Sequence, residues 1–200
     1  MPEDARGLFP VFLKLAGRPV LLIGGGRMAC AKLPELLRAG ALVTVVAPDV
    51  RPEITAFEEL VIARRPFARR DLDGVWYAVA AATPGVNREV ARAAAERRIF
   101  VNAVDDAASA TAYTGGVLRR GGATIAVSTE GRAPALAGLL REGLERVVPE
   151  NLEAWVVAAR DLRVRQRARR VPMGERRPLL LRALNDLYAS PGASRSEATA

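Results

Sequence analysis

Residues 19–32, "PVLLIGGGRMACAK", place three consecutive glycines directly after a short apolar run. Val20 to Ile23 are typical of a buried strand, and the glycines that follow are typical of a tight turn. The residues from Met28 to Ala39 predict a helix that ends at Gly40. Because glycine has no side chain, this turn indicates that another group comes very close to the backbone.

Strands and helices continue to alternate after this first unit. Pro34 lies inside the first predicted helix and is expected to kink it. Alternation at this spacing is typical of a doubly wound parallel sheet with right-handed crossovers. We therefore predict an α/β, Rossmann-like domain over residues 1–113. Its further strands are expected at Leu42 to Ala47, near Val61, within 75–83 and within 99–106, with a helix at 86–98.

The glycine turn also fits a known ligand-binding pattern, G-x-G-x-x-A, in residues 24–29. In that pattern Gly24 permits the tight turn, Gly26 lets the backbone approach a pyrophosphate, and Ala29 allows close helix-to-strand packing. The helix N-terminus offers free N–H groups to the anion. These features predict a dinucleotide cofactor; a glycine-rich turn with no ligand is the alternative.

The end of the second predicted strand leaves the choice of cofactor open. An acidic residue at this place normally binds the ribose hydroxyls. Here the sequence reads Pro48-Asp49, so either Asp49 or backbone groups would bind the ribose. Arg51 lies close by and suggests a 2′-phosphate instead. We favour NAD over NADP.

The pattern changes after residue 113. Two strands are expected to form a hairpin at Arg120-Gly121-Gly122, and Pro134 is placed at the first turn of a helix. A second helix is expected to open at Pro149. The apolar stripes of these helices need a covering partner, which is the other helix, later helices near Leu179 to Leu187, or a second subunit. We favour the second subunit and therefore expect a homodimer. The expected regions are a dimerisation region at 114–148, a helical region at 149–189 and a small, polar, disordered tail at 190–200. The stripes comprise Leu136, Leu139, Leu140, Leu144 and Val147 in the first helix, and Leu152, Trp155, Val156, Ala159 and Leu162 in the second.

The amino-acid composition excludes several kinds of catalytic and metal-binding site. The chain has no histidine, which excludes catalysis through a Ser-His-Asp or Cys-His arrangement and excludes imidazole metal ligands. Its single cysteine and the lack of a signal or membrane-spanning segment predict a cytoplasmic protein.

The net charge is +8, and nine arginines lie within residues 160–182. These arginines are either a solvated helix face or a site for a polyanion.

Five segments in order resemble the precorrin-2 dehydrogenase family, which includes the N-terminal part of siroheme synthase and some sirohydrochlorin ferrochelatases. The resemblance implies NAD-dependent oxidation of precorrin-2, a tetrapyrrole, to sirohydrochlorin. It also implies possible Fe²⁺ insertion, and a homodimer with a Rossmann-like domain, a central dimerisation region and C-terminal helices. The segments are "LFPVFLKLAGRPVLLIGGGRMACAKLPELLRAGALVTVVAPD", "AVAAATPGVN", "RIFVNAVDD", "TIAVSTEGRAPALAGLLREGLE" and "MGERR".

Site residues follow from matching positions. The essential aspartate of the family, at the end of N-x-V-D, falls on Asp105, which the resemblance makes the catalytic residue and a transient ligand of Fe²⁺. A carboxylate also suits a reaction that needs a base in a chain without histidine. The alternative for Asp105 is a turn or cap acid, and Asp106 is expected to face solvent. The implied cofactor-binding residues are Gly24, Gly25, Gly26, Arg27, Met28, Pro48, Asp49, Thr83 and Asn102.

The substrate is a polycarboxylate, and arginines pair well with carboxylates. Arg119, Arg120 and arginines within 163–177 are therefore candidate substrate ligands. Ser128 and Thr129 either bind substrate or cap the following helix.

Two other interpretations remain open. One is a regulator that senses NAD(H) and binds nucleic acid through its arginine-rich arm. The chain has no helix-turn-helix signature and no aromatic residues interleaved in that arm, so we expect no nucleic-acid partner. Its longest apolar run, Val75 to Ala82, is too short to cross a bilayer, so we expect no membrane partner. The other is a family member that binds tetrapyrrole without turning it over.

Overall fold

A computed structural model describes residues 7–189, with side chains as far as residue 186. The tail predicted to be disordered, residues 190–200, lies outside the described residues. The described chain divides into two compact units. The first contains residues 7–114 and 130–132, and the second contains residues 115–129 and 133–189.

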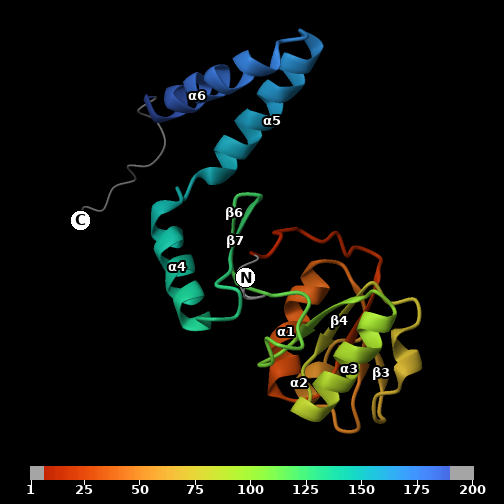
Figure 1. Cartoon of the computed structure of the whole chain (residues 1–200). Coiled ribbons are helices and arrows are strands. Elements are labelled where there is room, and N and C mark those ends of the chain that lie inside the picture. The colour runs from red at the N-terminus through yellow and green to blue at the C-terminus, as the bar shows by residue number, and fades with distance from the viewer. Residues whose placement is uncertain (1–6, 190–200) are drawn as a thin grey trace, which may run out of the picture. The chain divides into compact units, whose positions relative to one another are not determined.

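The first unit is built on a parallel sheet, drawn in Figure 1. Its five strands lie in the order β3-β2-β1-β4-β5, with all neighbours parallel. This arrangement confirms the predicted doubly wound, Rossmann-like α/β fold. The strands are β1 (Pro19–Ile23), β2 (Leu42–Val46), β3 (Val61–Ala63), β4 (Tyr77–Ala80) and β5 (Phe100–Ala103).

The strand order reverses between β1 and β4, because the chain moves outward from β1 to β3 and then returns to pair β4 with the other side of β1. In open α/β sheets, ligands bind in the crevice at such a reversal, beyond the carboxyl ends of the strands. The loops after Ile23, Ala80 and Ala103 therefore surround the expected site.

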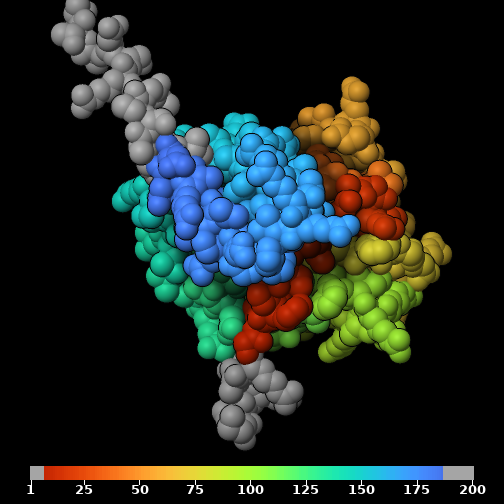
Figure 2. Space-filling view, turned by 90° about the horizontal axis from the view of Figure 1, so that it is seen from above, coloured from red at the N-terminus to blue at the C-terminus, as the bar shows by residue number. Residues whose placement is uncertain are grey.

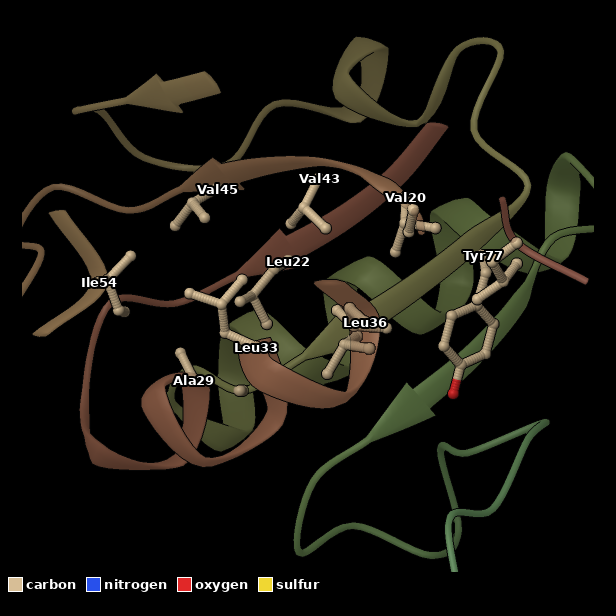
Figure 3. Close-up of a cluster of buried hydrophobic side chains, with 13 residues drawn as sticks. Val20, Leu22, Ala29, Leu33, Leu36, Val43, Val45, Ile54 and Tyr77 are labelled. Atoms are coloured by element: carbon tan, nitrogen blue, oxygen red, sulfur yellow. The ribbon is translucent and has the colours of Figure 1, made fainter. Parts of the chain in front are cut away.

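Alternate residues of β1 serve the two faces of the sheet, as the pleat requires. Val20 and Leu22 join the core on one face, and Leu21 and Ile23 join the core on the other. Both faces are covered, which explains why the strand sequences read as continuous apolar runs. Figure 3 shows the first core, in which Leu22, Val45, Leu33, Leu36 and Ile54 gather between the sheet and the helices.

Helices α1 (Arg27–Arg38) and α2 (Pro52–Thr55) contribute to the first core, whereas α3 (Pro84–Glu96) and the 3-10 turn η2 (Arg69–Leu72) contribute to the second. Helix α1 is continuous through Pro34, whose side chain is exposed. Gly40 follows its end with a φ of 72°, a left-handed value suited to glycine.

The chain after β5 folds back against that strand. The backbone N–H groups of Thr111 and Ala112 both donate to the carbonyl of Val101, at 2.9 and 3.0 Å. The Thr111 hydroxyl accepts from the N–H of Val101 at 2.8 Å, and the Tyr113 hydroxyl donates to the carbonyl of Ala107 at 2.8 Å. These bonds hold the loop that carries Asp105.

The second unit opens with the predicted hairpin. Strands β6 (Gly116–Arg120) and β7 (Ala123–Val127) pair antiparallel. Gly121 and Gly122 both have positive φ, 53° and 78°, as a two-residue turn of this kind requires. A Cβ on Gly121 would lie 2.3 Å from the backbone nitrogen of Glu153, so the hairpin tip contacts the start of the next helix pair.

Three helices complete the second unit: α4 (Pro134–Val147), α5 (Leu152–Ala168) and α6 (Met173–Ala189). Pro134 occupies the first turn of α4 as predicted. The prediction that Pro149 opens α5 is wrong, because residues 149–151 form a turn and the helix begins at Leu152. Helices α5 and α6 contact each other and lie side by side in the space-filling view of Figure 2.

Candidate active site

The three glycines of the turn have different surroundings. A Cβ on Gly24, whose φ is 112°, would lie 2.2 Å from the carbonyl oxygen of Ala81 at the end of β4. A Cβ on Gly25 would lie 2.1 Å from the carbonyl oxygen of Asp49, after β2. A Cβ on Gly26 would meet nothing within 4 Å. The first two glycines therefore pack against the neighbouring strand ends, and the third faces open space.

Gly26 is also the N-cap of α1, a helix of 12 residues. Gly26 has no side chain that could cap this end, and the first turn contains no acidic residue. The N–H groups and positive dipole end of the helix therefore have no carboxylate of their own. An open glycine before such a helix end fits the pyrophosphate of a dinucleotide, which needs close backbone approach and N–H donors. Arg27 and Met28, predicted to bind the cofactor, follow directly and are exposed.

Pro48 and Asp49 are exposed after the end of β2. The backbone N–H of Arg51 donates to the carbonyl of Gly25 at 3.0 Å, which fixes this loop against the glycine turn. The structure thus places Asp49 and Arg51, both considered as ribose or phosphate ligands, beside the predicted cofactor turn.

An open cavity of ≈ 530 Å³ lies at the carboxyl ends of the strands in the first unit. It brings Met28, from the start of α1, together with Asp105, from the loop after β5. These two residues are far apart in sequence, and the sheet topology places them in one site. The cavity is lined by Met28, Ala81, Ala82, Pro84, Asn87, Arg88, Val104, Asp105, Asp106, Ala108 and Ser109.

The two neighbouring aspartates differ in their surroundings. Asp105 is exposed at the cavity and has a φ of 58°, an uncommon left-handed value for a residue other than glycine. Asp106 is half-buried, and its carboxylate accepts from the N–H of Ser109 at 3.2 Å. The expectation that Asp106 faces solvent is therefore wrong, because it closes the turn that presents Asp105.

Asn87 is a cavity residue that the sequence analysis missed. Its side chain is 2% exposed; its Oδ1 accepts from the N–H of Ala82 at 3.0 Å, and its Nδ2 donates to the carbonyl of Val104 at 3.3 Å. It therefore joins the loop after β4 to the loop after β5. The available signal was its position three residues before Val90, on the buried face of α3.

Lys32, on α1, was also missed. Its Nζ donates to the Thr114 hydroxyl at 2.8 Å, which joins α1 to the end of the loop that carries Asp105. Burial lowers the pKa of the Lys32 ammonium, whereas the negative charge of Asp105 acts on that pKa in the opposite direction. The structure thus places a partly buried cation within electrostatic reach of Asp105.

Asn102 and Thr83 both lie at strand ends in the first unit. Asn102 is 7% exposed, and its Nδ2 donates to the carbonyl of Ala112 at 3.0 Å. Its buried Oδ1 has no hydrogen-bond partner within the described residues, and such an acceptor is one that a ligand or water commonly satisfies. Thr83 is the exposed N-cap residue of α3, without a side-chain cap bond.

The remaining candidates belong to the second unit. The Arg120 guanidinium donates to the carbonyls of Glu145, at 2.9 Å, and Val148, so it caps the end of α4. Its assignment to the substrate stays a prediction. The Thr129 hydroxyl accepts from the N–H of Ala133, the N-cap residue of α4, at 3.3 Å. Ser128 and Arg119 are exposed, and their assignment to the substrate stays a prediction.

The described residues contain neither a cluster of metal ligands nor a helix that could span a membrane. No three of the His, Cys, Asp and Glu side chains among them come together as metal ligands. None of their helices combines the length and apolar character that crossing a membrane requires.

The fold and the open glycine turn define a dinucleotide-binding protein of the Rossmann type, and the comparisons agree. Residues 11–116 match the family described as "Putative NAD(P)-binding", and residues 120–146 match the family described as "Sirohaem biosynthesis protein central". The chain belongs to the family described as "Putative NAD(P)-binding", whose model matches more than half of it. The second match agrees with the resemblance inferred from the sequence.

Two siroheme synthases are similar to this chain in sequence. The chain is 42% identical over 172 residues to siroheme synthase 3 of Aeromonas hydrophila, covering 84% of this chain and 37% of that enzyme. It is 39% identical over 180 residues to siroheme synthase 1 of Aeromonas salmonicida, covering 88% of this chain and 38% of that enzyme. The chain thus spans under two fifths of the length of these two relatives.

Among solved structures, SirC, a precorrin-2 dehydrogenase, superposes with a TM-score of 0.72 at 28% sequence identity. The match covers 90% of this chain and 92% of that one. The interpretation as a nucleic-acid-binding regulator gains no support from these comparisons.

Proposed function

We propose that this protein oxidises precorrin-2 to sirohydrochlorin with NAD⁺ as the hydride acceptor. The observation that carries the proposal is that Met28, directly after the open glycine turn, and Asp105 line the same cavity. The similarity to siroheme synthases and to a precorrin-2 dehydrogenase supplies the substrate class.

In this proposal Gly26 and the free N–H groups of α1 bind the pyrophosphate, and Asp49 lies beside the turn for the ribose. When bound, NAD⁺ supplies the acceptor for the hydride that leaves the substrate. Asp105 accepts the proton that leaves with it, because its carboxylate is exposed in the cavity and the chain contains no histidine. Asn87 and Asp106 hold the two loops that shape this cavity.

The test is to mix the purified protein with precorrin-2 and NAD⁺ and to follow NADH and sirohydrochlorin by their absorbance. We expect the two products to form in equal amounts. Binding of precorrin-2 without NADH formation would instead favour a protein that holds tetrapyrrole without oxidising it. Omitting NAD⁺ is the control for spontaneous oxidation by air.

We also propose that the protein is a homodimer formed through α4. One face of this helix contacts the hairpin, where Ala137 is 5% exposed. Four large apolar side chains of α4 are exposed: Leu136 at 48%, Leu139 at 64%, Leu140 at 47% and Val147 at 79%. A row of large apolar side chains on one helix is typical of a surface that a second copy covers.

Leu139→Glu is expected to convert the dimer to a monomer, because a buried, unpaired carboxylate at the centre of the row is unfavourable. Sedimentation velocity at several protein concentrations measures the change. Leu42→Glu is the matched control, since Leu42 is 61% exposed and lies on β2 in the other unit. If the Leu139→Glu protein sediments like the wild type, α4 does not form the dimer interface.

A further inference from the structure

An ion pair lies beside the predicted cofactor turn and has no place in the mechanism above. The Nε of Arg51 lies 3.2 Å from each carboxylate oxygen of Glu53, and its Nη2 lies 2.6 Å from Oε1. The two groups therefore meet in a forked arrangement that uses two of the nitrogens of the guanidinium. Both side chains are exposed, at 52% and 55%.

The backbone fixes where this pair stands. The N–H of Arg51 donates to the carbonyl of Gly25, and a Cβ on Gly25 would lie 2.8 Å from the Cα of Val50. Residues 49–51 are thus in direct contact with the turn that leads into α1. Glu53 follows in the first turn of α2, directly after Pro52.

The position of Arg51 after β2 is where a dinucleotide fold recognises the adenosine ribose. A free arginine there accommodates the 2′-phosphate of NADP, because a guanidinium binds phosphate through paired hydrogen bonds. A carboxylate on that guanidinium has two effects: it occupies donors of Nε and Nη2, and its charge repels the phosphate. The hydrogen bond from Arg51 lowers the pKa of the Glu53 carboxyl, so Glu53 stays ionised at neutral pH.

We propose that Glu53 determines cofactor specificity, by holding Arg51 away from a 2′-phosphate so that the site selects NAD over NADP. The inference rests on the dinucleotide binding proposed above and adds to it the residue that discriminates between the two cofactors. It assigns Glu53 a role in selectivity only, and none in hydride or proton transfer.

The test compares the affinities of NADH and NADPH, measured by the fluorescence of each cofactor during titration with the full chain. The variants are Glu53→Gln, which keeps the shape but removes the charge, and the double variant Arg51→Gln/Glu53→Gln. In the wild type we expect NADH to bind more tightly. In Glu53→Gln we expect NADPH to bind about tenfold more tightly than in the wild type, with NADH within about twofold. The double variant should lose that gain.

Glu35→Gln is the matched control, because Glu35 pairs with Arg38 at the far end of α1 and its loss changes the net charge equally. An unchanged NADPH-to-NADH ratio in Glu53→Gln, an equal gain in Glu35→Gln, or a gain that survives in the double variant would each overturn the proposal. The last result would assign the phosphate to another cation, such as the exposed Arg64 after β3. A wild type that binds neither cofactor would contradict dinucleotide binding itself, whereas NADH binding with no effect of Glu53 would contradict only this inference.

Discussion

Asp105→Asn should lower kcat for precorrin-2 oxidation by about 10²- to 10⁴-fold, the usual contribution of a general base. The carboxylate lies exposed in the cavity that also contains Met28, and an amide of the same shape cannot take up the proton. The affinity for NADH should stay within about twofold, because the glycine turn is untouched. Initial rates of NADH formation and a cofactor titration measure the two effects separately.

Asparagine is the right substitution because of the backbone. Asp105 has a φ of 58°, and asparagine tolerates this left-handed region, whereas alanine is strained there. In an alanine variant, the effect of losing the carboxylate could therefore not be separated from the effect of distorting the loop. The neighbouring variant Asp106→Asn keeps an acceptor for the N–H of Ser109 and should reduce kcat by no more than about threefold. Equal losses in the two variants would mean that the loop, and not the Asp105 carboxylate, is what the reaction needs.

The second large effect is expected from the glycine turn, where neighbouring residues should respond in opposite ways. Gly24→Ala should lower the free energy of unfolding by about 3–4 kcal/mol. The new Cβ would lie 2.2 Å from the carbonyl oxygen of Ala81, and a φ of 112° is unsuited to alanine. Because the clash is with backbone, the strand ends themselves would have to move apart. Urea unfolding followed by circular dichroism measures the loss.

Gly26→Ala should leave the free energy of unfolding within about 0.5 kcal/mol of the wild type. Its φ of −89° is allowed for alanine, and the added methyl would meet nothing within 4 Å. The affinity for NADH should nevertheless fall at least about tenfold, since the methyl would stand where the backbone is proposed to meet the pyrophosphate. Normal NADH binding by this variant would show that the cofactor lies elsewhere.

Local patterns were sufficient to predict the first unit and its turn. The apolar runs at β1, β2, β4 and β5 are each bounded by turn residues, and the glycine motif directly follows one of them. The placement of Asp105 near the turn also follows from sequence, because parallel strands bring their carboxyl ends to one edge. The role of Asp105 in the reaction and the insertion of Fe²⁺ stay predictions.

The residues that were missed act through contacts between distant segments. In the sequence, Lys32 does not differ from any other charged residue on a helix surface. Its hydrogen bond joins it to Thr114, which lies 82 residues further along the chain. Asn87 bonds to the carbonyl of Val104, across 17 residues. Arg120 is predicted to bind substrate from its charge, and the structure adds a contact that the sequence does not show, because the packing of α4 on β6 brings the last carbonyls of that helix within its reach. Hydrogen-bond partners that are distant in sequence depend on the tertiary structure, so the periodic pattern of the sequence does not reveal them.

The close fit of Gly24 against Ala81 and of Gly25 against Asp49 has a thermodynamic consequence for ligand association. Backbone contacts already hold the ends of β1, β2 and β4 together, so the glycine turn has its binding conformation before the ligand arrives. Little conformational entropy is then lost when a dinucleotide docks, and more of the gross interaction energy remains as affinity.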